Sequence, residues 1–103
     1  MFRTHSIIYV LTIALTSFAG TAFAQNPPAY ATAAVADSAR PAEQRADDAA
    51  RMPATVIAFA RVRPGAVVAE LRPGRGYYTR IISKAVGANG KLYVVESAER
   101  VQA

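Results

Sequence analysis

Apolar residues in the second half of the chain fall into short runs that glycine and proline separate. Apart from Glu70, residues 66–71 are apolar and partly β-branched, which is typical of a strand buried on both faces in a parallel sheet. Residues 77–86 repeat apolar side chains at spacings of three and four, and so predict a helix with one apolar face. Residues 91–96 are a second apolar run and predict a second strand.

The region before this unit predicts two helices. Residues 45–51 mix charged residues with alanine and can form a short helix. A second helix is expected to begin near Pro53, because proline is tolerated in a first helical turn. Its apolar stripe is expected to pack against one face of the first strand, and consists of Val56, Ile57, Phe59 and Ala60. Pro64 and Gly65 then end the helix in a tight turn.

The N-terminal part of the chain has the pattern of a leader followed by a linker. Residues 1–24 combine a short basic start, an apolar run and an Ala-x-Ala site, which together predict a secretory signal peptide. The mature protein is therefore expected in the periplasm or secreted, with no stable membrane span after cleavage. Residues 25–44 are rich in alanine, contain three prolines and predict a flexible linker. The expected folded domain is residues 45–103.

Charge and cysteine content narrow the possible partners. The chain has 12 Lys and Arg residues against 7 Asp and Glu residues, a net charge of +5. No basic helix with interleaved aromatic residues accompanies this charge, so we expect a solvated basic face and no nucleic-acid binding. The absence of cysteine means that no disulfide stabilises the small core, and no metal site is predicted. We also expect self-association through the open edge of the sheet.

Candidate binding residues follow the two predicted strands. A right-handed helical crossover brings the ends of both parallel strands to one edge, where open α/β folds bind ligands. Glu70 and Glu96 lie at these ends, with Gly74 and Gly76 in the turn between them. Glycine lets the backbone approach a ligand, and the free amides at the helix start attract a negative group. Glu96 is placed to accept the hydroxyls of a ribose, although it also fits a solvated strand end. Glu70 is equally well placed to accept hydrogen bonds from the backbone amides of the loop.

Residues 45–97 resemble the N-terminal part of class I S-adenosylmethionine-dependent methyltransferases, particularly a group of exported, predicted methyltransferases. The resemblance is carried by a helix that ends in a Pro-Gly turn, an acidic strand end with a glycine loop, the run Tyr77-Tyr78-Thr79 and a lysine-led second strand. It implies an α/β fold, specifically a partial Rossmann-like three-layer sandwich that forms the N-terminal half of the methyltransferase fold. The implied cofactor is S-adenosyl-L-methionine.

The family motif reads acidic, apolar, Gly, x, Gly, x, Gly. The residues that match it are Glu70, Leu71, Gly74 and Gly76, and Arg72 replaces the first glycine. By resemblance, the two glycines would approach the methionine part of the cofactor, Glu70 would organise the loop and the amino group, and Glu96 would hold the ribose hydroxyls. If the position of Arg72 requires a glycine-like backbone, a side chain there costs about 1 to 3 kcal/mol. This cost is enough to weaken cofactor binding about tenfold or more.

The resemblance implies a methyltransferase-like protein that is truncated or degenerate and inactive by itself. The family sheet has more strands than the two predicted here, so the methyl acceptor and any catalytic residue are unknown, and whether the chain is an enzyme stays open. One alternative is an NAD-type dinucleotide-binding fragment, in which Gly74, Gly76 and Thr79 approximate the glycine fingerprint. Another is a small exported interaction module without enzymatic activity, whose sheet edge pairs with a second chain.

Overall fold

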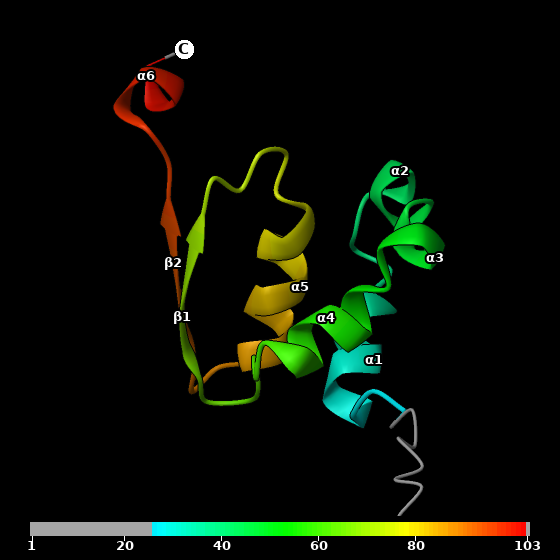
Figure 1. Ribbon diagram of the computed structural model, residues 1–103. Coiled ribbons are helices and arrows are strands. Elements are labelled where there is room, and N and C mark those ends of the chain that lie inside the picture. Colours follow the sequence, from blue (N-terminus) through cyan, green and yellow to red (C-terminus); the bar gives the residue numbers. More distant parts are fainter. Residues whose placement is uncertain (1–25, 103) are drawn as a thin grey trace, which may run out of the picture.

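The computed structural model describes residues 26–102, and this part of the chain contains six helices and two strands (Figure 1). They are α1 (Ala29–Val35), α2 (Ala42–Arg45), α3 (Asp48–Arg51), α4 (Pro53–Phe59), β1 (Val67–Leu71), α5 (Tyr77–Val86), β2 (Lys91–Val95) and α6 (Ala98–Val101). The predicted helix, strand, helix and strand from residue 53 onwards are confirmed, which agrees with an α/β fold. The predicted signal peptide lies outside the described residues. Among the helices of residues 26–102, none combines the length and apolarity that crossing a membrane requires.

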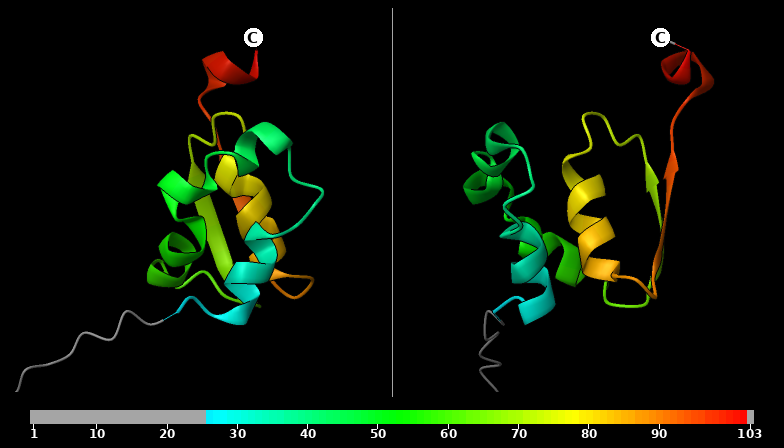
Figure 2. Two further views of the ribbon diagram at one scale, coloured as in Figure 1. Left: turned by 90° about the vertical axis from the view of Figure 1, so that its right-hand side faces the viewer. Right: turned by 180° about the vertical axis from the view of Figure 1, so that it is seen from behind.

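The two strands form a parallel sheet, as the sequence predicted. The register pairs Val67 with Lys91 and Leu71 with Val95, so the carboxyl ends of both strands lie at the same edge. The crossover between them contains α5, which lies along one face of the sheet (Figures 1 and 2). Helices α1 and α4 lie on the side of α5 that is turned away from the sheet. The molecule is therefore layered as sheet, α5, and then the pair α1 and α4.

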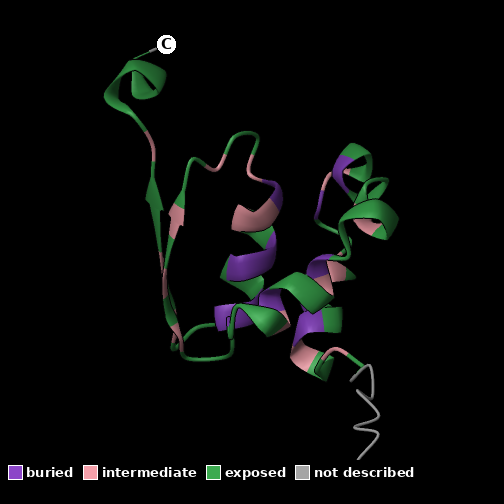
Figure 3. Cartoon of the chain, viewed as in Figure 1, coloured by how far each residue is buried: buried purple, intermediate pink, exposed green. Residues whose placement is uncertain are grey.

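The most deeply buried side chains lie among the three helices rather than within the sheet (Figure 3). They are Ala31 and Ala34 of α1, Ile57 of α4, Val62, and Tyr77, Ile81, Ile82, Ala85 and Val86 of α5. On the sheet, Val68 and Leu92 pack against this cluster while remaining partly exposed. The spacing of three and four along α5 therefore predicted its buried face, since Ile81, Ile82 and Ala85 all lie on it.

The prediction that β1 is buried on both faces was wrong. Val67 and Leu71 are 72% and 71% exposed, and Tyr93 of β2 is 53% exposed. Side chains alternate along a strand, so these residues share the face that is turned away from α5. No element of residues 26–102 covers that face. A short β-branched run fits a strand covered on one face as well as a strand covered on two, and the sequence alone did not separate the two cases.

The predicted partner of α4 was also wrong. Helix α4 packs against α1, which in turn packs against α5. Of the predicted apolar stripe only Ile57 is buried, whereas Phe59 is 89% exposed. A helix of seven residues makes about two turns and presents a single narrow face to one neighbour. Here α1 is that neighbour.

The largest correction concerns residues 25–44, which the sequence predicted to be a flexible linker. Helix α1 lies within this range, and Ala31 and Ala34 are buried in the core. Alanine is the best helix former, and its small side chain lets two helices approach closely. The single helix predicted over residues 45–51 is not observed. Instead, α2 ends at Arg45 and α3 begins at Asp48.

Candidate functional site

The loop between β1 and α5 contains three residues with left-handed backbone angles. The φ angles of Arg72, Gly74 and Gly76 are 58°, 58° and 80°. The amide of Gly76 donates a hydrogen bond to the carbonyl of Pro73 at 2.9 Å and closes the turn directly before α5. Arg72 therefore has the glycine-like backbone whose cost the sequence analysis considered. Its amide donates to the carbonyl of Val95 at 2.9 Å, which links the first residue of the loop to the end of β2.

The two loop glycines are required for different reasons. A methyl group placed on Gly74 would meet no heavy atom within 4 Å, so only the positive φ angle favours glycine there. The same group on Gly76 would lie 2.9 Å from Nη1 of Arg80, which adds crowding to the positive φ angle. The open space beside Gly74 leaves the backbone accessible from that side.

Glu70 connects the end of β1 to the first turn of α5. The hydroxyl of Thr79 donates to Oε2 of Glu70 at 2.6 Å. This is the only hydrogen bond to the Glu70 side chain within residues 26–102. The interpretation of Glu70 as an acceptor for loop amides is therefore wrong, because its partner is a side-chain hydroxyl. No pattern in the sequence indicated this role of Thr79.

Glu96 lies at the same edge of the sheet, as the parallel pairing predicted. Glu70 pairs with Val94, and Glu96 directly follows the last residue of β2. Its Oε1 accepts a hydrogen bond from the amide of Ser97 at 2.9 Å. Among the described residues, no hydrogen-bond partner is common to the side chains of Glu70 and Glu96. The edge is thus common to both carboxylates, but their surroundings differ.

Two hollows are lined by three of the four predicted site residues. One has a volume of about 450 Å³ and is lined by Pro73, Gly74, Arg75, Gly76, Thr79, Arg80 and Val94. The other, about 440 Å³, lies between β1 and α4, and its lining includes Glu70, Arg72 and Tyr78. Glu96 lines neither hollow. The two glycines therefore line one hollow and Glu70 lines the other, while Thr79, the hydrogen-bond partner of Glu70, lines the hollow of the glycines.

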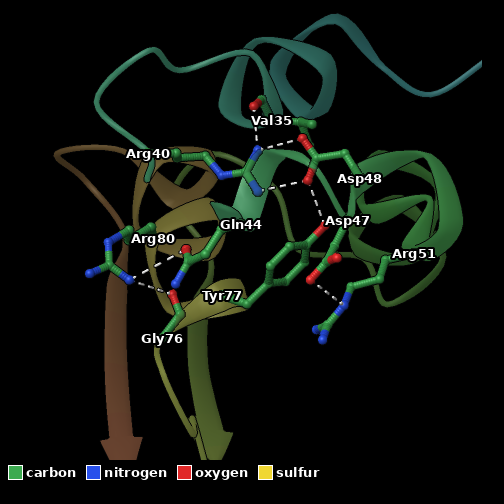
Figure 4. A network of polar contacts seen from close by, with 9 residues as sticks. All are labelled: Val35, Arg40, Gln44, Asp47, Asp48, Arg51, Gly76, Tyr77 and Arg80. Atoms are coloured by element: carbon green, nitrogen blue, oxygen red, sulfur yellow. Dashed lines mark hydrogen bonds and ion pairs between the residues drawn. The ribbon is translucent and has the colours of Figure 1, made fainter. Parts of the chain in front are cut away.

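A polar network that the sequence analysis missed joins α3 to the start of α5 (Figure 4). Arg40 is 3% exposed and donates from both terminal nitrogens to the carboxylate of Asp48, each at 2.8 Å. Arg40 also donates to the carbonyl of Val35 at 2.6 Å. The hydroxyl of Tyr77 donates to Asp48 Oδ1 at 2.6 Å, and the guanidinium of Arg51 lies 4.3 Å from the Tyr77 ring centre. The only sequence signal for this network was a lone arginine in an alanine-rich stretch.

The network holds its members in fixed charge states. The hydrogen bond from Arg40 lowers the pKa of Asp48, and the hydrogen bond to Asp48 raises the pKa of Arg40. Burial, followed by the hydrogen bond to Asp48, raises the pKa of Tyr77 to about 12. At neutral pH, Asp48 is therefore a carboxylate, Arg40 is a cation and Tyr77 is a neutral donor, which are the states that the observed hydrogen bonds require.

Within residues 26–102, no group of three or more His, Asp or Glu side chains is arranged to hold a metal ion. Comparisons with models of protein families, with curated proteins and with solved structures find no match for this chain. The features that bear on function are therefore the loop, the two carboxylates and their surroundings.

Proposed function

We propose that the carboxyl edge of the sheet binds S-adenosyl-L-methionine, in the manner of the first strand, glycine loop and helix of a class I methyltransferase. The observation that carries the proposal is the left-handed loop between β1 and α5, which has Glu70 directly before it and Gly76 at its end. The parallel pairing adds Glu96 at the same edge. This is the edge at which open α/β folds bind nucleotide cofactors.

The start of α5 suits the carboxylate of the cofactor. Helix α5 has ten residues, and no side chain caps its first amides. Such amides carry partial positive charge and bind anions. The open space beside Gly74 lets the methionine part of the cofactor approach the backbone.

The two carboxylates have complementary roles in this proposal. Thr79 occupies Oε2 of Glu70, and the remaining oxygen is assigned to the cofactor's amino group. Glu96 accepts from the ribose hydroxyls at the end of the second strand. We assign no catalytic residue in residues 26–102. The proposed unit therefore binds the cofactor and is inactive by itself.

Calorimetric titration with S-adenosylmethionine, S-adenosylhomocysteine and NAD tests the proposal. We expect both adenosyl ligands to bind and NAD not to bind. Binding of NAD alone would favour a dinucleotide-binding fragment instead. That alternative is disfavoured by Thr79, which stands where the dinucleotide fingerprint needs a third glycine for close packing and which is already bonded to Glu70.

Replacing Arg72 with glycine is expected to increase the affinity for S-adenosylhomocysteine about tenfold. The left-handed backbone of Arg72 raises the free energy of the binding-competent loop, and glycine removes that cost and raises the competent fraction. The affinity for S-adenosylmethionine should increase more than the affinity for S-adenosylhomocysteine, because the substitution also removes a positive charge near the sulfonium. Calorimetry of both ligands measures both effects.

Arg63→Ala is the control for net charge, because it removes an exposed cation outside the loop at a residue without a positive φ angle. It should leave the affinity for neutral S-adenosylhomocysteine unchanged. If Arg72→Gly folds equally well and binds either ligand no more tightly, backbone strain does not limit this site.

A further inference from the structure

A second set of contacts holds the glycine loop from the side of α2 (Figure 4). Gln44 is 8% exposed, and its Nε2 donates to the carbonyl of Arg75 at 3.1 Å. Its Oε1 lies 3.5 Å from Nη1 of Arg80. The same nitrogen of Arg80 donates to the carbonyls of Arg75 and Gly76, each at 3.1 Å. The carbonyl of Arg75 therefore accepts hydrogen bonds from one side chain of α2 and one of α5, and Arg80 also binds the carbonyl of Gly76.

The position of Gln44 depends on the neighbouring ion pair. Helices α2 and α3 have four residues each, too few to be stable without tertiary contacts. Arg40 and Asp48 anchor this segment to Tyr77, the first residue of α5. We call the five residues Arg40, Gln44, Asp48, Tyr77 and Arg80 the clasp. Gln44 and Arg40 are the two buried polar side chains of the described chain, and both belong to it.

We propose that Gln44 and Arg80 are positioning residues for the ligand loop, and that closing of the clasp is coupled to ligand binding. The clasp fixes the peptide units of Arg75 and Gly76, which directly precede the first amides of α5. A ligand that binds those amides favours the ordered loop and thereby the ordered α2 and α3. Only the ligand part of this inference rests on the proposed function, since the contacts exist without a ligand.

Gln44→Met tests the positioning role by hydrogen exchange. Methionine fills a similar volume but forms neither hydrogen bond, so the amides of residues 74–80 should exchange about tenfold faster, equivalent to about 1.4 kcal/mol. The amides of β2 should be unchanged, because the hydrogen bonds of the Gln44 side chain go to the loop and to α5. The matched control is Glu43→Met on the same helix, since Glu43 is exposed and forms no hydrogen bond or ion pair within residues 26–102.

Unchanged exchange in residues 74–80, or equal acceleration throughout the chain, would overturn the positioning role. Arg80→Lys provides a second variant if Gln44→Met fails to fold. Arg80 is exposed, and lysine keeps the charge but lacks the planar group that reaches Gln44 and both carbonyls. Local acceleration is expected here as well, and its absence in this variant would count against the proposal.

The coupling is tested by adding S-adenosylhomocysteine to the wild-type chain. Slower exchange is expected in residues 74–80 and also in residues 42–51, and Gln44→Met should bind the ligand about tenfold more weakly. Protection of the loop alone would overturn the coupling. If wild type binds no ligand, the proposed function fails and the coupling fails with it, while exchange in the two variants still decides the positioning role.

Discussion

Arg40→Met is expected to lower the free energy of unfolding by about 3 kcal/mol. The substitution leaves the carboxylate of Asp48 without its bidentate partner and the carbonyl of Val35 without a donor. The side chain of Asp48 is 23% exposed, so water compensates in part, and the lower end of the usual range for breaking a buried pair applies. A domain of this size has little stability to lose. Urea unfolding followed by circular dichroism measures the change.

Arg63→Met is the matched control, because Arg63 is exposed and its side chain forms no hydrogen bond or ion pair in the described residues. It should change the stability by less than about 0.5 kcal/mol. The double variant Arg40→Met with Asp48→Leu should recover part of the loss, since it removes the unpaired charge as well. Equal stability of Arg40→Met and Arg63→Met would show that the ion pair does not hold the N-terminal helices.

Gly90→Ala is expected to destabilise the chain by about 3 kcal/mol, for steric reasons. An added methyl group would lie 2.6 Å from the carbonyl oxygen of Val86 and 2.8 Å from that of Ala66, and would also overlap the Val86 side chain. Both oxygens accept backbone hydrogen bonds, from Gly65 and Lys91, so neither can move without breaking the junction of α5 with the two strands. Thermal and urea unfolding measure the loss.

Gly74→Ala is the matched control, because it measures the conformational cost of replacing a glycine without a steric clash. Gly74 has a positive φ angle but open space around it, so alanine should cost only about 1 kcal/mol. Gly90 shows the reverse combination of crowding without a positive φ angle. If Gly90→Ala were no more destabilising than Gly74→Ala, the close approach at Gly90 would not limit stability.

Local patterns were sufficient to predict the order of helices and strands from residue 53 to residue 95. The bounds of α5 match the prediction, because the glycines at its two ends and the spacing of Ile81, Ile82 and Ala85 are all read within a few residues. The loop glycines were predicted for their backbone freedom, and both have positive φ angles. The order of strand, loop, helix and strand then determined that the two carboxylates share an edge.

Features that depend on distant residues could not be predicted in this way. Asp48 and Tyr77 are 29 positions apart, and no local spacing indicates that they form a hydrogen bond. Helix α1 was missed because alanine contributes little to an apolar pattern, although Ala31 and Ala34 are buried. The exposed face with Val67 and Leu71 was missed because sequence patterns describe the side chains of a strand and not the elements available to cover them.

Amide NMR titration of the chain with S-adenosylhomocysteine tests the proposed binding site most directly. The proposal predicts saturable shifts concentrated at residues 70–79 and 96–97, the loop, the first turn of α5 and the end of the second strand. The amides of Val67 and Lys91, at the opposite edge of the sheet, should remain unshifted. Absence of shifts at millimolar ligand, or shifts confined to residues away from the carboxyl edge of the sheet, would contradict it.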